Sequence, residues 1–185
     1  MTIQVLFVQG AGNGAHDKWD SKLVASLING LGGGYVVKFP RMPTESDPHF
    51  ADWKAALERE FETLGDGDIL VGHSVGATTL VHTLAAKAPP FAPGALILLA
   101  PPFIGEDGWP SQDISPRNDF ARSLPPAMPV RLYHGTDDAT VPWAHSRLYA
   151  KAMPQSEIIS VSKGNHQFHN DVGRVARDIR ALAET

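Results

Sequence analysis

The sequence contains no cysteine among its 185 residues. This absence excludes disulfide bonds, thiolate zinc sites and a cysteine nucleophile together. Charged residues are also sparse, at 19% of the chain, and the formal net charge is -4. We therefore expect no surface for nucleic acid or for an anionic membrane, and we predict a small-molecule substrate as the partner.

Long hydrophobic runs are missing as well. No apolar stretch approaches the roughly 18 residues of a membrane-spanning helix, and the first residues lack the basic segment of a signal peptide. These absences predict a cytoplasmic protein. The length of the chain and its apolar content of 43% predict a single domain over residues 1–185 with a substantial core.

Patterns typical of strands and helices alternate along the chain. Short apolar runs predict strands at residues 3–8, 35–39, 69–71, 94–100, 130–134 and 157–161. Apolar residues at helical spacing predict helices at residues 19–31, 50–64, 75–87, 143–153 and 172–182. The alternation predicts a three-layer, doubly wound α/β fold with a mostly parallel six-stranded sheet and helices on both faces.

Residues 101–126 interrupt this alternation. The segment holds six prolines and has weak periodicity, so we expect mostly loop with a short helix near residues 118–123. It is the candidate for a short lid or loop insertion.

A glycine-flanked serine follows the third predicted strand. The stretch Gly72-His73-Ser74-Val75-Gly76 has the form G-x-S-x-G between an apolar strand and a helical stretch. A nucleophile elbow needs this context, because the chain reverses so tightly that its neighbours tolerate little side chain. The pentapeptide alone fits a plain glycine turn equally well.

A serine nucleophile needs a base and a group that orients the base, and both types follow in the chain. Asp137 and Asp138 come after the fifth predicted strand, and His166 and His169 come after the sixth. The order Ser, Asp, His is that of α/β-hydrolases. Either aspartate satisfies the chemistry, while His169 lies against the last helix, where a surface or capping role is expected.

With these residues, the chain resembles the α/β-hydrolase superfamily and is similar over nearly its whole length to the small, nearly capless serine hydrolases that include retinoblastoma-binding protein nine. The superfamily's acid commonly lies in a G-x-x-D-x-x-V-P stretch, which residues 135–142 match with Asp138. Its histidine commonly follows a small glycine-containing turn, which corresponds to His166. The resemblance implies Ser74 as nucleophile, Asp138 as orienting acid and His166 as general base.

An oxyanion hole needs two backbone N–H groups. Val75, directly after the nucleophile, supplies the first. The resemblance implies that Ala11, in the glycine-rich loop after the first strand, supplies the second. Gln9 stands where many relatives carry histidine, which leaves open how this loop is braced.

The same glycine-rich loop has a rival interpretation. Residues 10–15 fit the G-x-G-x-x-A pattern of dinucleotide-binding loops, and Lys38 or Arg41 could meet a 2′-phosphate. An NADP-dependent reductase would leave the Ser, Asp and His residues unexplained. Potential metal ligands occur as adjacent pairs without spaced partners, so we expect no metal and no cofactor.

The sequence thus predicts a serine hydrolase that cleaves a carboxylic ester, or a thioester or amide, of a small substrate through an acyl-enzyme. The alternative is a hydrolase-fold protein that mainly binds a partner and has weak catalysis. The oligomeric state is not predicted.

Overall fold

A parallel sheet organises the computed structural model, which describes residues 2–183. Within these residues the sheet has six strands in the order β2-β1-β3-β4-β5-β6, and every neighbouring pair is parallel. The strands are β1 (Ile3–Val8), β2 (Tyr35–Lys38), β3 (Ile69–His73), β4 (Ala95–Leu99), β5 (Val130–Gly135) and β6 (Glu157–Val161). The doubly wound α/β fold is confirmed.

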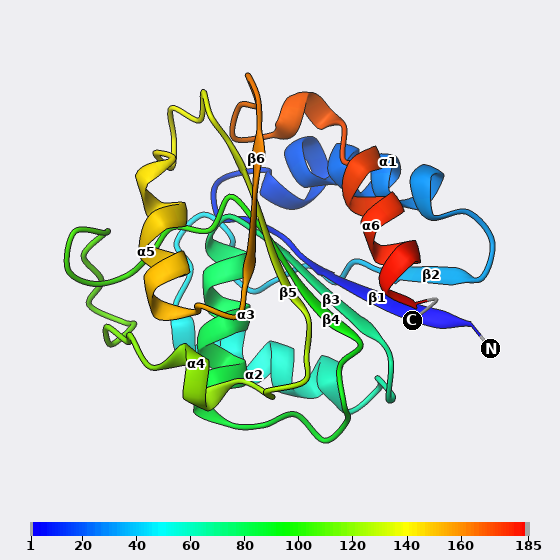
Figure 1. The fold of residues 1–185 in the computed structure, drawn as a ribbon, viewed down its shortest axis with the longest axis horizontal. Helices are drawn as coiled ribbons and strands as arrows, with labels where there is room; N and C mark the ends of the chain where they lie inside the picture. The colour runs from blue at the N-terminus through cyan, green and yellow to red at the C-terminus, as the bar shows by residue number, and fades with distance from the viewer. Residues whose placement is uncertain (1, 184–185) are drawn as a thin grey trace.

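Helices cover both faces of the sheet (Figure 1). One face packs against α1 (Ser21–Leu31) and α6 (Gly173–Ala183). The other packs against α2 (Phe50–Phe61), α3 (Val75–Ala86), α4 (Phe120–Ser123) and α5 (Ala144–Ala152). Across residues 2–183, none of the helices has the length and apolar character needed to cross a membrane.

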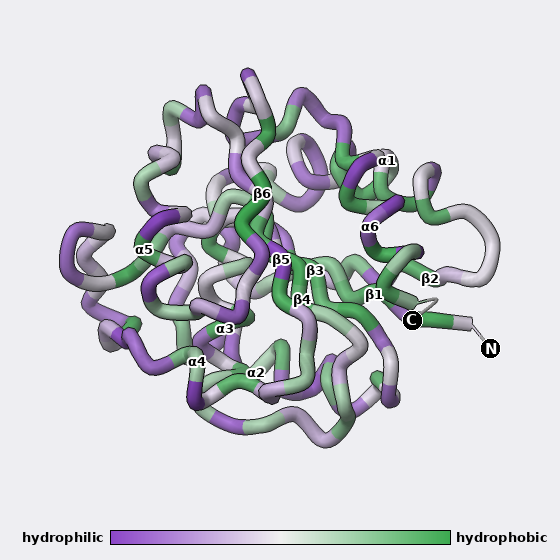
Figure 2. The backbone as a smooth tube through the Cα atoms, viewed as in Figure 1, coloured by the Kyte–Doolittle hydropathy of each residue, from purple (hydrophilic) through white to green (hydrophobic). Residues whose placement is uncertain are grey.

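The buried core follows from the strand sequences, which form the hydrophobic centre in Figure 2. In β4, Leu96 and Leu98 point into the core beneath α2, α3 and α5, whereas Ile97 and Leu99 point into the core beneath α1 and α6. Side chains alternate between the faces of a strand. A strand covered on both faces therefore needs a continuous apolar run, as this one has.

The first observed α-helix begins later than the predicted helix 19–31. Residues Ala15–Asp20 form a π-helical turn, η1, and α1 begins only at Ser21. A π turn changes the angular spacing of the side chains, and Trp19 is 51% exposed while Asp20 is 1% exposed. Ile28, which we expected on the apolar stripe, is 49% exposed. The stripe prediction was therefore wrong at Trp19 and Ile28.

Residues 101–126 pack onto the helices without forming a large cap. The segment contains α4 and a single bridge between Ile104 and Trp109. Phe120 of α4 is fully buried in the core that holds α3 and α5. The minimal cap expected from the sequence is confirmed.

Candidate active site

The sheet order places the site. The chain passes from β1 to β2 on one side, and then returns to the other side of β1 to form β3. In open parallel sheets, ligands bind at such a switch point, at the carboxyl ends of the strands. The glycine-rich loop leaves β1 there and begins with Gln9. The candidate elbow leaves β3 there, and Ser74 is the residue between β3 and α3. The glycine-rich loop and the elbow therefore lie side by side at the switch point.

Ser74 occupies a sharp turn between β3 and α3. Its φ of 52° and ψ of -128° lie in a region that L-residues rarely adopt. A Cβ at Gly72 would lie 2.5 Å from the Cα of Ala77, and a Cβ at Gly76 would lie 2.0 Å from the carbonyl oxygen of Gln9. Both contacts are too short for any side chain, so the two glycines are required for the tight turn that presents the serine.

The serine begins a chain of two hydrogen bonds. The Ser74 Oγ lies 3.0 Å from His166 Nε2, and His166 Nδ1 lies 2.8 Å from Asp138 Oδ2. An ionised carboxylate only accepts, so His166 donates through Nδ1 and its Nε2 is left to accept the serine hydroxyl. The structure thus brings together the three residues that sequence reasoning selected.

The two aspartates of the loop after β5 have different surroundings. Asp138 is buried and accepts the N–H groups of Thr140 and Val141 at 2.8 and 2.9 Å. Burial alone would raise the pKa of Asp138, but the hydrogen bonds from His134 and His166 hold it well below its ordinary value. Asp137 is exposed. Of the two, Asp138 is the carboxylate that contacts His166.

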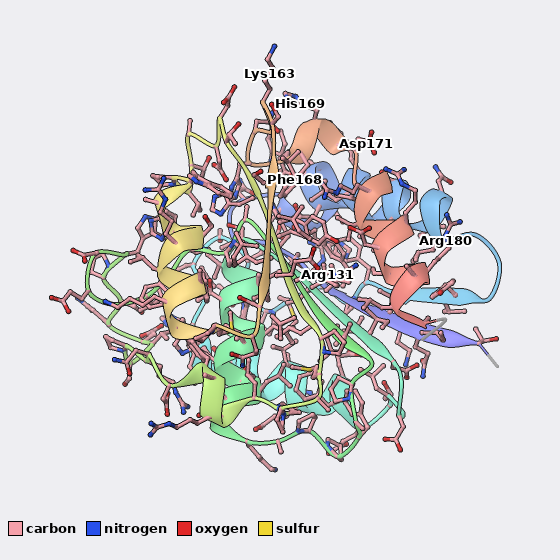
Figure 3. The ribbon with its side chains drawn as sticks, in the orientation of Figure 1. Arg131, Lys163, Phe168, His169, Asp171 and Arg180 are labelled. Atoms are coloured by element: carbon pink, nitrogen blue, oxygen red, sulfur yellow. The ribbon has the colours of Figure 1, made fainter. Side chains whose placement is uncertain are left out.

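His169 lies away from the serine. Its Nε2 donates to the carbonyl oxygen of Lys163 over 2.8 Å, and its side chain is exposed. Figure 3 shows Lys163 and His169 together at the tip of the loop after β6. This contact braces the loop that carries His166.

Unpaired N–H groups lie at the elbow and in the glycine-rich loop beside it. Among residues 2–183, neither the N–H of Ala11 nor that of Val75 donates a hydrogen bond. By contrast, the Gly10 N–H donates to Asp20 Oδ2 and the Gly12 N–H donates to the carbonyl oxygen of Glu45, both over 2.6 Å. Val75 is the first residue of α3, where a helix has no internal acceptor for its N–H groups. Ala11 and Val75 are the two residues that the sequence analysis named for an oxyanion hole, and the N–H groups of both are unpaired within the part of the chain that the structure describes.

The brace of the glycine-rich loop is Glu45, a residue that sequence reasoning missed. The fully buried Gln9 donates to Glu45 Oε2 over 2.7 Å. The same carboxylate accepts the N–H groups of Gly14 and His16, each over 3.0 Å. Glu45 lies in the irregular segment between β2 and α2, where no periodicity or motif marks it.

The groups required by a dinucleotide are engaged elsewhere. The Glu45 carboxylate occupies the N–H groups that would face a phosphate. Arg41 pairs with Asp17, and the Lys38 ammonium donates to the Thr63 hydroxyl over 2.9 Å. Within residues 2–183, no three His, Asp or Glu side chains are grouped so that they could hold a metal ion.

A pocket of about 350 Å³ opens beside Val75. Its apolar wall comes from α2, α3 and the segment 101–126, with the side chains of Phe50, Trp53, Val75, Ile104 and Ile114. His49 and Asp113 also line the pocket and contact each other over 3.3 Å.

The chain is similar to known hydrolases. The family model described as "Serine hydrolase" matches residues 5–175. No curated protein sequence gives a significant match. Among solved structures, the product of the ydeN gene of B. subtilis has a TM-score of 0.77 at 20% identity, over 100% of both chains.

Two further solved structures share the fold at low identity. Est1E from Butyrivibrio proteoclasticus has a TM-score of 0.75 at 16% identity, over 99% of this chain and 88% of that chain. A monoacylglycerol lipase of Paleococcus ferrophilus has a TM-score of 0.69 at 17% identity, over 99% of this chain and 94% of that chain. Because the family model matches residues 5–175, the chain belongs to the serine hydrolase family, and its fold is the α/β-hydrolase fold.

Proposed function

We propose that the protein hydrolyses carboxylic esters of small acyl groups through an acyl-enzyme formed on Ser74. The observation that carries the proposal is the hydrogen-bonded chain from Ser74 Oγ through His166 to Asp138. A serine hydroxyl is a weak nucleophile at neutral pH, and an adjacent oriented base is what activates it. The serine hydrolase family of the chain supports the same chemistry.

In the first half of the reaction, the Ser74 Oγ attacks the ester carbonyl carbon while His166 Nε2 takes the hydroxyl proton. The carbonyl oxygen becomes an oxyanion, which the N–H groups of Ala11 and Val75 stabilise. The carbon–oxygen bond to the alcohol then breaks, and the leaving alcohol receives the proton from His166. Asp138 stays ionised throughout, for which its lowered pKa is suited.

In the second half, water attacks the acyl-enzyme carbonyl and passes a proton to His166 Nε2. Collapse of the second oxyanion releases the carboxylic acid and returns the proton to Ser74. Both halves use the same histidine and the same two N–H groups.

The pocket beside Val75 supports a small, uncharged acyl group. Its volume is about 350 Å³, and apolar side chains from α2, α3 and the segment 101–126 form much of its wall beside polar residues such as His49 and Asp113. The apolar part of the wall favours burial of a short hydrocarbon or ring. Est1E has also been solved with ferulic acid bound, and the Paleococcus ferrophilus protein is a lipase. Both names support esters as the substrate class.

The test is hydrolysis of p-nitrophenyl acetate and butyrate by the wild type and by Ser74→Ala. The proposal expects the variant to lose turnover, whereas Ser146→Ala, at a buried serine that contacts the Trp143 carbonyl, keeps it. Equal rates for the wild type and Ser74→Ala would overturn the proposal. A panel of matched thioesters and amides then separates the reaction subclasses.

A further inference from the structure

A second histidine–aspartate pair lies beside the first. His73 and Asp20 are each 1% exposed, and His73 Nδ1 lies 2.9 Å and 3.0 Å from the two Asp20 carboxylate oxygens. The rings of His73 and His166 have centroids 4.9 Å apart. The reaction described above uses neither member of this pair.

The pair contacts three of the four segments that build the site, all except the loop that carries Asp138. His73 Nε2 lies 3.0 Å from the backbone carbonyl oxygen of His166. Asp20 accepts the Gly10 N–H over 2.6 Å and the Gln167 side-chain amide over 3.3 Å. These contacts fall next to Ala11 in the glycine-rich loop, next to Ser74 in the elbow and on His166 itself.

The contacts fix the protonation of the pair. The carbonyl oxygen of His166 and the carboxylate of Asp20 are both acceptors, so both ring nitrogens of His73 donate. His73 is then an imidazolium facing an aspartate. Burial opposes this charge, but the Asp20 carboxylate raises the pKa of His73 above its ordinary value. A buried ion pair with satisfied hydrogen bonds tolerates little displacement, because water cannot replace a lost partner.

We propose that Asp20 and His73 are positioning residues for hydrolysis at Ser74, holding the His166 backbone and the Gly10 amide in register with the elbow. This inference rests on the proposed function. Oxyanion donors and a general base act only when they lie within a few tenths of an ångström of the productive geometry, on the order of 0.5 Å. The buried Asp20–His73 ion pair restricts this geometry, because it holds the Gly10 N–H at one end and the His166 carbonyl oxygen at the other.

Asp68 provides a matched control. It is another buried carboxylate, 6% exposed, and it lies directly before β3, whereas His73 is the last residue of that strand. It accepts the backbone N–H groups of Gln4 and Gly65, each over 2.8 Å. Its removal therefore disturbs similar backbone hydrogen bonds without touching any segment of the site.

The test compares Asp20→Ala, Asp20→Asn and Asp68→Ala with the wild type, using kcat and KM for p-nitrophenyl acetate at a temperature where thermal unfolding shows each protein folded. We expect Asp20→Ala to lower kcat by about tenfold to a hundredfold with little change in KM. We expect Asp68→Ala to keep kcat within about twofold of the wild type, since small shifts far from the reacting atoms have little effect on orientation.

Asp20→Asn is the rescue variant. Its amide oxygen still accepts the Gly10 N–H, its NH2 group donates to a neutral His73, and His73 Nε2 still donates to His166. We expect kcat within about threefold of the wild type, because the hydrogen bonds to the Gly10 N–H, to His73 and to the His166 carbonyl oxygen are kept and only the longer contact with the Gln167 amide is lost. The inference is overturned if Asp20→Ala keeps the wild-type kcat, if Asp68→Ala loses as much, or if Asp20→Asn fails as badly as Asp20→Ala.

A spectroscopic measurement needs no turnover. Nitrogen-15 NMR of Ser74→Ala at pH 7 should show two protonated ring nitrogens on His73, and the Asp20→Asn form of that protein should show one. A singly protonated His73 in Ser74→Ala overturns the inference. Failure of the proposed function is recognised separately, because then Ser74→Ala hydrolyses esters as fast as the wild type.

Discussion

The side-chain amide of Gln9 donates to the carboxylate of Glu45 over 2.7 Å. This contact connects the end of β1 to the segment before α2, and it orients a carboxylate that also accepts two N–H groups of the glycine-rich loop. The loop that carries Ala11 is therefore held by a carboxylate rather than by a histidine at position 9.

Glu45→Ala should loosen this loop. Loss of the carboxylate leaves the Gly14 and His16 N–H groups without their acceptor, and the free energy of unfolding should fall by about 1–3 kcal/mol. We expect kcat for p-nitrophenyl acetate to fall about tenfold, because an oxyanion donor is displaced. Glu58→Ala, at an exposed residue of α2 that pairs with Lys54, is the control. An unchanged kcat in Glu45→Ala would contradict the role of the brace.

Asp138→Asn and Asp137→Asn should separate the two neighbouring aspartates. In Asp138→Asn, the NH2 group faces His166 Nδ1, so the ring proton moves to Nε2 and the histidine can no longer accept from Ser74. We expect kcat to fall by about a thousandfold to ten-thousandfold. Asp137→Asn should change kcat by less than about twofold, because the exposed Asp137 does not contact His166. Steady-state kinetics of both variants tests which aspartate orients His166. Equal losses of kcat in the two variants would count against Asp138 as the orienting acid.

His82 should make stability depend on pH. Its ring is buried on α3 against Phe50 and Phe120, and burial lowers its pKa to about 4. Between pH 6.5 and about 4, the unfolded chain binds a proton that the folded protein does not, so the free energy of unfolding falls as the pH falls. His82 alone should contribute up to about 3 kcal/mol over this window.

Urea unfolding of His82→Leu across the same pH range measures this contribution. The free energy of unfolding of the variant should fall less steeply with falling pH than that of the wild type, and the difference in slope should correspond to at most one proton. Parallel curves for the wild type and His82→Leu would show that the pKa of His82 is the same in the folded and unfolded protein, which would contradict this prediction.

Ile114→Trp should narrow the pocket beside Val75. Ile114 is largely buried in the pocket wall, and a larger side chain removes space that a longer acyl group needs. We expect the ratio of kcat/KM for butyrate to that for acetate to fall by about tenfold. Val36→Trp, on the exposed face of the edge strand β2, should leave the ratio unchanged. An unaltered ratio in Ile114→Trp would place the acyl group elsewhere.

The parts of this protein that could be predicted from its sequence have local signals. The apolar run of β4 and the glycines around Ser74 each report on a strand or a turn within a few residues. The stripe of α1 failed at Trp19 because the π turn before the helix leaves no local pattern, and it also failed at Ile28, which is 49% exposed.

The connections that hold the site have no such signal. Asp20 contacts His73 across 53 residues, and Gln9 contacts Glu45 across 36 residues. In the sequence, none of these four side chains differs from an ordinary polar residue of a loop, a turn or the end of a strand. Only the folded backbone brings the partners together, so the sequence analysis gave His73 and Asp20 no role in the site and left the brace at Gln9 open.

Labelling with a fluorophosphonate tests the central claim most directly, because the probe reacts with an activated serine and needs no known substrate. The wild type should take up one equivalent at Ser74, as mapped by mass spectrometry of the digested protein. Ser74→Ala should take up none, and His166→Gln should react far more slowly. Modification of another residue, or equal uptake by the wild type and Ser74→Ala, would contradict the account.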